Sequence, residues 1–598
     1  MDMKSIKQLL YEGEKVDTEC KKAEKAVPRS VYESYSAFAN TKGGYIILGV
    51  EEDESKQLPE ERFIIQGIDN PTKQMQDFWS TINSGKVNRN ILKDENVYIV
   101  EEDGVSVLVI HVPRVDYKQR PVYVGENPYK GTYKRNHEGD YHATEDEVRA
   151  MLRDQNPEGN DSLVLEHYSI DDIDMETLKH YRKMFQTRNP DHIWNSYEDK
   201  EFLEALGGYR KDRGTGTEGL TLAGLMMFGN GLAVRDEFDN IFMDYRDESQ
   251  VTSEIRWNDR VTYDGTWENN LFNFFTKVIP KLTVDLKKPF ILENQQRVDD
   301  TPVHKAIREA FVNLIIHADY LLDAGTLKII KTSDGFSFTN PGILKLPKEE
   351  IFKGGNSKPR NPRMQTMLRL VGFGDNAGSG FPTILAVWRD SGWVEPELTE
   401  DTVLNQVTLK LRTVRVLDTV MKSMVEQLSQ IPTFSKNEME KLINIFRDNQ
   451  LDSTNASPDN WIKTVEILYD RLSDMADNSK DDIEKALDII AQKISEIAAL
   501  SGGSNKFAKE LADILAESAE KSAESAEKLS DRQKQILSIM ETGVEYSADD
   551  IAKQLDLKGS RTRQLLNELV KMGAITGTTA TKNRRYIKVK TNGMFLNL

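Results

Sequence analysis

The chain has 598 residues, of which 79 are lysine or arginine and 97 are aspartate or glutamate, so its formal net charge is −18. This length predicts about four domains that can each bury a core, and the acidic balance excludes a protein that coats nucleic acid along its whole surface, because non-specific binding is electrostatic. The single cysteine, Cys20, excludes an internal disulfide and a zinc site built from several cysteines.

The first segment, Met1 to Lys22, is charged throughout and lacks the apolar core of a secretory signal. No apolar run approaches about 20 residues, the length that a membrane-spanning helix needs. We therefore expect a cytosolic protein with no membrane partner.

The first expected domain, residues 1–155, places acidic residues on either side of a helix and a strand. The pattern predicts a helix from about Pro28 to Asn40 and a buried strand from Tyr45 to Val50, with glycines between them that permit a tight stop. If Glu14 and Glu19 lie on or beside a strand paired with this one, their carboxylates and that of Asp53 can gather round one cation. Carboxylate oxygens suit Mg²⁺ or Mn²⁺, and such ions activate water against a phosphodiester.

The run from Ser36 to Val50 resembles the signature of the AlbA-like domain of the Schlafen family. The resemblance implies an RNA-cleaving metal site with two glutamates five residues apart, here Glu14 and Glu19, followed by an aspartate after the strand, for which Asp53 is the candidate. Domains of this type also bind nucleic acid without cleaving it, so both interpretations remain open.

Basic side chains alternate with tyrosines in the distal half of this domain. Cations beside aromatic rings suit phosphate contact and base stacking, so Arg120, Lys134 and Arg135 are candidate RNA-binding residues. The same alternation is ordinary for a half-exposed strand.

Residues 156–300 are expected to form an α/β connector. Its short apolar segments, Leu222–Gly229 and Asn240–Tyr245, predict small buried elements. The polar loop Arg210–Thr217 could touch phosphate, but a plain surface loop explains it better. We assign no chemistry to this region.

A helix predicted from Ala306 to Tyr320 carries the most informative pattern. Glu309 and Asn313 are four residues apart on one helix face, so a carboxylate and an amide can converge on one ion or phosphate. Such pairs also occur by chance on exposed helices. Further along, the run Gly378-Ser379-Gly380 opens an apolar helix, where backbone N–H groups can approach phosphate oxygens.

In this order, the elements over about Thr301 to Arg412 resemble the GHKL ATPase fold of gyrase, heat-shock chaperones, histidine kinases and mismatch-repair proteins, in the divergent form found beside Schlafen-type domains. The resemblance implies an ATP site in which Glu309 polarises the attacking water and Asn313 holds Mg²⁺. Where the family has Asp-x-Gly near the adenine, this chain has Asn340-Pro341-Gly342. The expected cofactor-binding residues are Asn313, His317, Asp319, Asn340, Gly342, Gly378, Ser379 and Gly380.

Residues 416–530 are expected to form a helical spacer or assembly region. The repeat from Glu517 to Lys528 favours helix but nearly lacks a large apolar stripe. It fits homo-oligomerisation and a solvated arm between domains equally well.

Residues 531–598 resemble a winged helix-turn-helix, with three helical patterns followed by two strand-like segments. Arg561 and Arg563 lie at the start of the third pattern, where a recognition helix meets the DNA major groove. Lys582, Arg584 and Arg585 would form the wing. The alternative is a winged helix that binds a protein.

The sequence as a whole predicts a multidomain α/β (α+β) protein. The expected domains are an AlbA-like Schlafen domain (1–155), a connector (156–300), a divergent GHKL ATP-binding sandwich (301–415), a helical spacer (416–530) and a winged helix (531–598). We expect an ATP-binding protein that acts on nucleic acid, with RNA at the N-terminal domain and DNA at the winged helix. Family association suggests a metal-dependent endoribonuclease in anti-phage defence, with or without weak ATPase activity. The alternatives are a nucleotide-sensing transcriptional regulator and an oligomeric scaffold.

Overall fold

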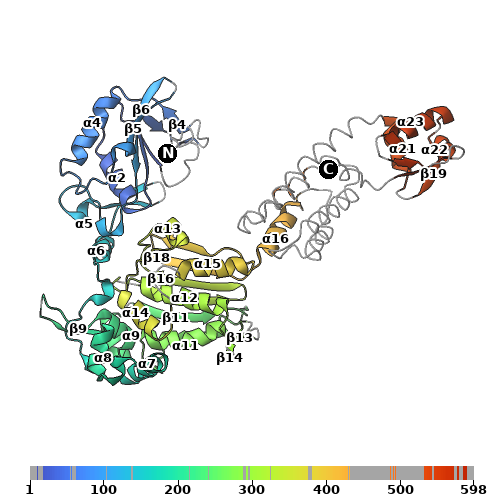
Figure 1. Ribbon diagram of the computed structural model, residues 1–598. Helices are drawn as coiled ribbons and strands as arrows, with labels where there is room; N and C mark the ends of the chain where they lie inside the picture. Colours follow the sequence, from blue (N-terminus) through green and yellow to red (C-terminus); the bar gives the residue numbers. More distant parts are fainter. Residues whose placement is uncertain are drawn as a thin grey trace. The chain divides into compact units, whose positions relative to one another are not determined.

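The computed structural model describes residues 10, 18–53, 55–56, 62–102, 104–136, 139–214, 216–239, 241–252, 254–286, 291–293, 296–298, 300–322, 325–374, 380–428, 430, 485, 489, 492, 531–541, 544–555, 557–571, 575–577 and 584–588. The chain comprises two compact units, residues 1–415 and 416–598 (Figure 1). Among the predicted site residues, Glu14, Gly378, Ser379 and Lys582 lie outside the described residues, as does most of the expected assembly region. Within the described ranges, no helix combines the length and the apolar composition that crossing a membrane requires.

The N-terminal part of unit 1 is built on a four-stranded sheet of order β1-β2-β6-β5. The strands are β1 (Thr18–Lys21), β2 (Gly44–Leu48), β5 (Val97–Glu102) and β6 (Val105–Val112). Side chains alternate between the two faces: Ile46 and Leu48 share a core with residues of helices α2 (Ser30–Asn40) and α4 (Pro71–Ile82), whereas Ile47 packs on the opposite face. β1 runs parallel to β2 and places Glu19 beside Ile46.

Glycine ends helix α2, as the sequence predicts. Gly43 has a φ of +81°, and its N–H donates to the carbonyl oxygen of Phe38 at 2.9 Å. A Cβ there would lie 2.8 Å from the carbonyl oxygen of Val112, so only glycine fits this turn. Smaller elements complete this part: β3 (Val50–Glu52), β4 (Phe63–Ile65), α5 (Pro128–Gly131), β7 (Tyr133–Asn136), β8 (Gly139–His142) and α6 (Glu145–Asp154).

The second part of unit 1 contains a six-stranded sheet of order β12-β11-β15-β16-β18-β17. Its strands are β11 (Ile241–Asp247), β12 (Asp259–Thr262), β15 (Gly325–Thr332), β16 (Gly335–Pro341), β17 (Glu397–Asp401) and β18 (Gln406–Arg412). Only β11 and β15 pair in parallel; the remaining neighbours are antiparallel. Alternate residues of β15, such as Leu327 and Ile329, are buried, which indicates one covered face.

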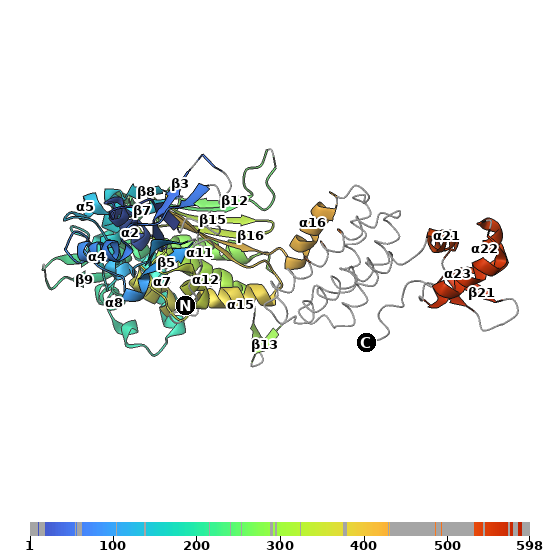
Figure 2. The ribbon, with the colours of Figure 1, turned by 90° about the horizontal axis from the view of Figure 1, so that it is seen from above.

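Helix α12 (Pro302–His317) lies between α11 (Leu271–Thr283) and α15 (Gly380–Asp390), as Figures 1 and 2 show. Thr301 caps its first turn by accepting the N–H of His304, and Pro302 occupies the first helical position, where no N–H is needed. Most of α12 is buried, including Ile307, Phe311 and Ile315. The helix is therefore held rigidly against the sheet by its own apolar surface.

The expected connector shares this core. Its helices and strands are α7 (Met175–Arg188), α8 (Asp199–Leu206), β9 (Tyr209–Lys211), β10 (Glu218–Leu220), α9 (Leu222–Phe228) and α10 (Gly231–Glu237). One apolar cluster runs from Leu165 to Leu411, and the Tyr181 hydroxyl donates to the carbonyl oxygen of Met367 at 2.7 Å. The sequence-based boundary at residue 300 thus does not separate two cores, because β11 and α11 on its N-terminal side belong to the same layered structure. The remaining elements of this part are β13 (Ile291–Glu293), β14 (Gln296–Val298), α13 (Lys348–Lys353) and α14 (Pro362–Leu370).

Unit 2 contains helix α16 (Val416–Leu428) and, near the C-terminus, a small three-helix and three-strand fold. Its elements are α21 (Asp531–Ile539), β19 (Glu545–Ser547), α22 (Ala548–Gln554), α23 (Gly559–Lys571), β20 (Ile575–Gly577) and β21 (Arg585–Lys588). The strand order is β19-β21-β20, and a compact core includes Ile536, Ile551, Leu566 and Tyr586.

Candidate functional site

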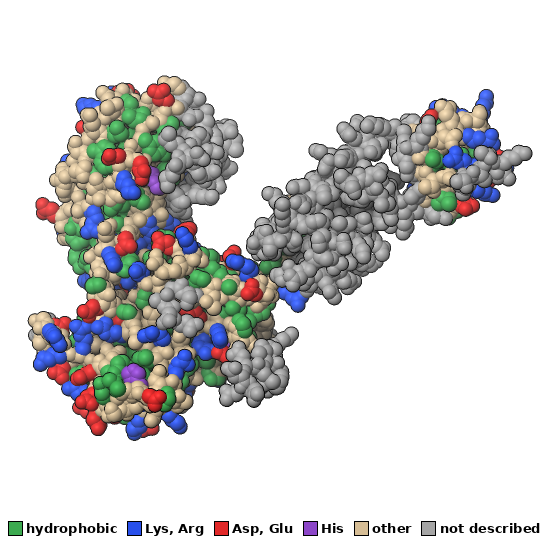
Figure 3. Space-filling view, in the orientation of Figure 1, with side chains coloured by type: hydrophobic (Ala, Val, Ile, Leu, Met, Phe, Trp, Pro, Cys, Tyr) green, Lys and Arg blue, Asp and Glu red, His purple; other side chains and the backbone are tan. Residues whose placement is uncertain are grey.

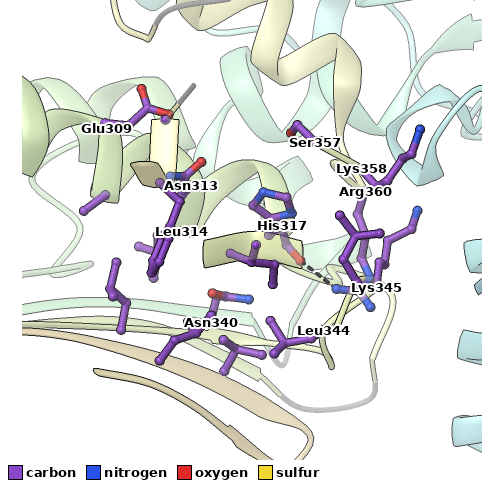
Figure 4. A pocket seen from close by; sticks show the side chains of 18 of the residues that line it. Glu309, Asn313, Leu314, His317, Asn340, Leu344, Lys345, Ser357, Lys358 and Arg360 are labelled. Atoms are coloured by element: carbon purple, nitrogen blue, oxygen red, sulfur yellow. Dashed lines mark hydrogen bonds between the residues drawn. The ribbon is translucent and has the colours of Figure 1, made fainter. Parts of the chain in front are cut away.

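A pocket between α12 and the six-stranded sheet gathers five of the residues expected to bind a nucleotide (Figure 4). They are Glu309, Asn313, His317, Asn340 and Gly380. The pocket has a cavity volume of about 130 Å³ and opens to solvent. Apolar side chains from the sheet, including Phe338, Leu398, Val407 and Leu409, line it as well. An apolar wall with a few polar groups facing it suits a flat organic ring that carries a charged tail.

The polar residues of α12 form one stripe along this pocket. Glu309, Asn313 and His317 follow each other at four-residue intervals, so they lie on the same helix face. The opposite faces of α12 are buried among apolar residues. Within the described part of the chain, the Asn313 amide makes no hydrogen bond, so its oxygen is available to a metal ion. Oxygen donors of this kind are what Mg²⁺ prefers.

Glycine at the start of α15 brings a helix N-terminus to this stripe. A Cβ at position 380 would overlap the Glu309 carboxylate, so Gly380 allows the two groups to approach closely. Exposed N–H groups make the start of a helix favourable for negative charge. Gly380 thus lets the start of α15 lie directly beside Glu309. Gly378 and Ser379 are outside the described residues.

Cations gather at the other end of the pocket, where Lys345, Lys358 and Arg360 line it beside His317 (Figure 4). Burial, with added repulsion from Arg360 and Lys345, lowers the pKa of His317 to about 3, so the imidazole is neutral at physiological pH. Burial also lowers the pKa of Lys345 to about 8. The Lys345 ammonium lies 4.4 Å from the centre of the Tyr117 ring in the N-terminal domain.

Asn340 occupies the position where the GHKL resemblance predicts an aspartate. It is 7% exposed, and its Nδ2 donates to the carbonyl oxygen of Pro341 at 3.2 Å. Because that carbonyl can only accept, the contact fixes which end of the amide is nitrogen. The Oδ1 atom remains an acceptor in a residue that lines the pocket, and an amine is its natural partner.

Asp319 and Gly342 support the pocket wall from behind. The Asp319 side chain is 1% exposed and pairs with Arg153 at 3.2 Å. Gly342 has a φ of +104°, and a Cβ there would lie 3.1 Å from the Cβ of Asp319. Neither residue lines the pocket between α12 and the sheet; both line a smaller cavity next to it.

Arg360 joins the pocket to the preceding domain, a role that no local sequence pattern predicts. Its buried guanidinium bonds both carboxylate oxygens of Asp154 at 2.9 and 2.8 Å. It also donates to the carbonyl oxygens of His317 at 2.9 Å and Ile343 at 2.6 Å. Arg360 thus ties the end of α6 to the end of α12 and to the turn after β16.

The carboxylates predicted for the N-terminal metal site are only partly described. Glu19 accepts from Lys21 at 2.7 Å and from Arg135 at 2.6 Å, so cations hold both of its oxygens. Asp53 accepts the hydroxyl and the N–H of Ser55, which lower its pKa below the ordinary value. No cluster of three or more His, Cys, Asp or Glu with metal-site geometry occurs among the described residues, and Glu14 is not one of them.

The basic residues predicted to meet RNA are largely turned inward. Arg120 is 3% and Arg135 5% exposed, and Arg135 pairs with Glu19 and with Asp140. Lys134 pairs with the buried Glu147. In unit 2, by contrast, Arg561, Arg563 and Arg585 are exposed, and Arg584 is half-buried against Tyr586.

Comparison with protein families matches three successive parts of the chain. Residues 12–144 match the family described as Schlafen, AlbA_2. The N-terminal part is a Schlafen AlbA_2 domain. Residues 326–410, which include β16, β17 and most of β15 and β18, match the family described as "Putative ATP-dependent DNA helicase recG C-terminal", so an ATPase-like domain follows the AlbA_2 domain. Residues 149–244, between them, match a domain of unknown function.

Two solved structures resemble the chain only loosely, one over nearly its whole length and one over about a quarter of it. The DIP2311 protein from Corynebacterium diphtheriae is 15% identical, with a TM-score of 0.33, over 96% of this chain and 94% of that one. The N-terminal domain of a RecG-related protein from Nitrosomonas europaea, titled an ATP-dependent DNA helicase relative, is 26% identical, with a TM-score of 0.19, over 24% of this chain and 95% of that one. No curated protein sequence matches significantly.

The lowered pKa of Lys345 predicts a pH dependence of ligand binding. Below a pKa of about 8 the ammonium is charged and attracts an anionic nucleotide; above it, this attraction is lost. We expect ATP affinity to fall about three- to tenfold between pH 7 and pH 9.5, as measured by calorimetric titration. In Lys345→Met the profile should be nearly flat, and an unchanged slope in that variant would assign the effect to other groups.

Proposed function

We propose that this protein binds ATP with Mg²⁺ in the pocket between α12 and the sheet, and that the nucleotide regulates action on nucleic acid. The observation that carries the proposal is the stripe of Glu309, Asn313 and His317 along an apolar-walled pocket, with the N-terminal end of α15 directly beside Glu309. The match of residues 326–410 to an ATPase-like family supports it. The fold that fits this arrangement is the divergent GHKL sandwich.

Each polar group of the pocket has a distinct task in this proposal. The Asn313 oxygen would hold Mg²⁺, which supplies charge neutralisation for the phosphates when bound. Glu309 would polarise a water for attack, and N–H groups in the first turn of α15 would donate hydrogen bonds to phosphate oxygens. Oδ1 of Asn340 would accept a hydrogen bond from the adenine amine, while its Nδ2 donates to the carbonyl oxygen of Pro341. The amide can therefore replace the aspartate of related sites as an acceptor.

The AlbA_2 domain is the proposed nucleic-acid-acting part. The visible surface of the described residues mixes basic and acidic side chains without one large basic face (Figure 3), which agrees with local contact rather than coating. The name of the family matched by residues 326–410 refers to a DNA helicase, and the AlbA_2 match of residues 12–144 supports placing nucleic-acid contact in this domain.

Metal-dependent cleavage of RNA by the N-terminal domain remains a prediction, and it can be tested directly. RNA is incubated with full-length protein and Mn²⁺, and cleavage should be lost in Glu14→Ala and in Glu19→Gln. The glutamine keeps an acceptor for the buried Arg135, so the fold is preserved while the charge is removed. Circular dichroism of both variants checks this. RNA that is bound but stays intact would assign the domain to binding alone.

The alternative of a DNA-binding regulator rests on unit 2. We propose that its C-terminal fold is a winged helix whose helix α23 presents the exposed Arg561 and Arg563 to DNA. Selection of bound sequences from a random DNA pool tests this. We expect enrichment that the Arg561→Ala/Arg563→Ala double variant reduces about tenfold or more; equal enrichment by both proteins would remove this function from α23.

A further inference from the structure

A second cavity of about 650 Å³ lies between the AlbA_2 domain and the edge of the six-stranded sheet. The AlbA_2 wall carries Lys42, Arg114, Arg120 and Arg135. The opposite wall is formed by the β17–β18 hairpin with Lys410. The cavity is separate from the pocket below α12 and shares only Ile343 with it.

Arg120 is an unusual residue in this wall because it is almost completely buried without a paired carboxylate. Its Nε donates to the carbonyl oxygen of Val115 at 3.3 Å, and among the described residues it forms no ion pair. Burial and the neighbouring Arg114 lower its pKa to about 9, against the opposing effect of Glu400 and Asp154. An unpaired guanidinium in a buried position costs stability unless an anion joins it.

Arg114 adds a second incompletely bonded guanidinium. Its Nη2 donates to the carbonyl oxygen of Leu344 at 2.6 Å, but its buried Nε has no hydrogen-bond partner among the described residues. Burial lowers its pKa as well. Two adjacent arginines that repel each other therefore face one space.

The acids Glu400 and Asp401, and the cations Arg135 and Lys410, already have partners, whereas the exposed Lys42 has none among the described residues. Glu400 accepts the N–H of Leu344 at 2.7 Å, and Asp401 accepts the N–H groups of Val403 and Leu404 at 2.9 Å each. Arg135 is held by Glu19 and Asp140. Lys410 lies 3.7 Å from Glu397. Arg114 and Arg120 are thus the guanidinium groups of the cavity with unused donors.

We propose that this cavity binds a phosphate group, carried by a free nucleotide or by a nucleic-acid strand, between Arg114 and Arg120. Guanidinium groups offer several N–H donors in a plane and match phosphate oxygens in pairs. The space exceeds that of an inorganic ion, so the phosphate would belong to a larger molecule. The inference goes beyond the ATP pocket of α12 and does not depend on it.

The test uses the full-length chain and the variant Arg120→Met, with Arg29→Met as the matched control. Arg29 is 87% exposed and does not line the cavity, so both variants lose one positive charge from the same domain. The probes are inorganic phosphate, a 5′-phosphorylated RNA tetranucleotide and the same tetranucleotide without the 5′ phosphate. Binding is measured by calorimetry and by the shift of the thermal unfolding midpoint.

We expect Arg120→Met to weaken binding of the phosphorylated probe about tenfold or more, and Arg29→Met to change it less than about twofold. Without probe, Arg120→Met should unfold at the same temperature as the wild type or higher, because a buried unpaired cation has been removed. A drop in probe affinity with an intact fold therefore reports the loss of the arginine itself.

Further experiments identify which kind of molecule carries the phosphate. They also distinguish binding in this cavity from binding in the ATP pocket. Inorganic phosphate that competes as well as the tetranucleotide supports a site for the phosphate of small molecules. A clear preference for the tetranucleotide supports a strand. Asn313→Ala should leave probe binding unchanged while it weakens ATP binding. A wild type that responds to no probe, or equal losses in Arg120→Met and Arg29→Met, would overturn the proposal.

Discussion

Replacing Asn313 by alanine is expected to weaken binding of Mg²⁺-ATP about 10- to 100-fold, because it removes the amide oxygen available to the metal in the pocket. The substitution adds no bulk, and Asn313 makes no hydrogen bond within the described part of the chain, so the fold should be unaffected. Glu309→Gln should bind nucleotide with nearly wild-type affinity. Any ATP hydrolysis by the wild type should fall about 100-fold or more in that variant, since the amide cannot polarise water as a carboxylate does. Calorimetric titration and a phosphate-release assay measure the two effects.

Asn258→Ala is the control for this experiment, because its amide bonds Ser249 on the surface and does not line the pocket. Titration with GTP tests the role of Asn340. GTP carries a carbonyl where ATP carries the amine, so it cannot donate to Oδ1 of Asn340 and should bind more weakly than ATP. Affinity for ATP that is equal in the wild type, Asn313→Ala and Asn258→Ala would remove Asn313 from the site.

Arg360→Met is expected to destabilise unit 1 by about 3–5 kcal/mol, the usual effect of breaking a buried ion pair from one side. The substitution leaves Asp154, which is 6% exposed, without its cation, and it leaves the carbonyl oxygens of His317 and Ile343 without a donor. The urea midpoint measures the loss. ATP affinity should fall as well, because His317 and Ile343 belong to the pocket wall.

Two further variants test whether the loss of stability in Arg360→Met is due to the buried ion pair with Asp154. Lys179→Met removes a cation that pairs with Glu176 on the exposed surface, and it should leave the urea midpoint unchanged. The double variant Asp154→Leu/Arg360→Met should regain a large part of the stability, because it replaces both charges by apolar groups. An Arg360→Met protein as stable as the wild type would show that the bidentate pair adds nothing to the fold.

The parts of the fold that follow from local periodicity could be predicted from the sequence. The helix that carries Glu309 and Asn313, the glycine stop after Asn40 and the strand from Tyr45 each depend on residues within a few positions of one another. The four-residue spacing of Glu309, Asn313 and His317 alone therefore predicts that these side chains lie on one face of α12.

Long-range pairing and burial could not be predicted in the same way. Asp154 and Arg360 are 206 positions apart, and nothing near either residue indicates the other. Parallel pairing of β11 with β15 moves part of the expected connector into the ATPase-like sheet. The alternation around Arg120 and Arg135 fits an exposed strand, yet packing against the rest of unit 1 turns both arginines inward. These features depend on which surfaces pack together in the folded chain. Local sequence patterns do not show which surfaces will be in contact.

The most direct test of the proposed ATP site is a crystal structure of the full-length chain with ADP and Mg²⁺. The account predicts density for the nucleotide between α12 and the six-stranded sheet, with Mg²⁺ bound by the oxygen of Asn313 and the adenine amine within hydrogen-bond distance of Oδ1 of Asn340. A nucleotide found elsewhere, or side chains of the sheet packed against Asn313 with no nucleotide between them, would contradict it.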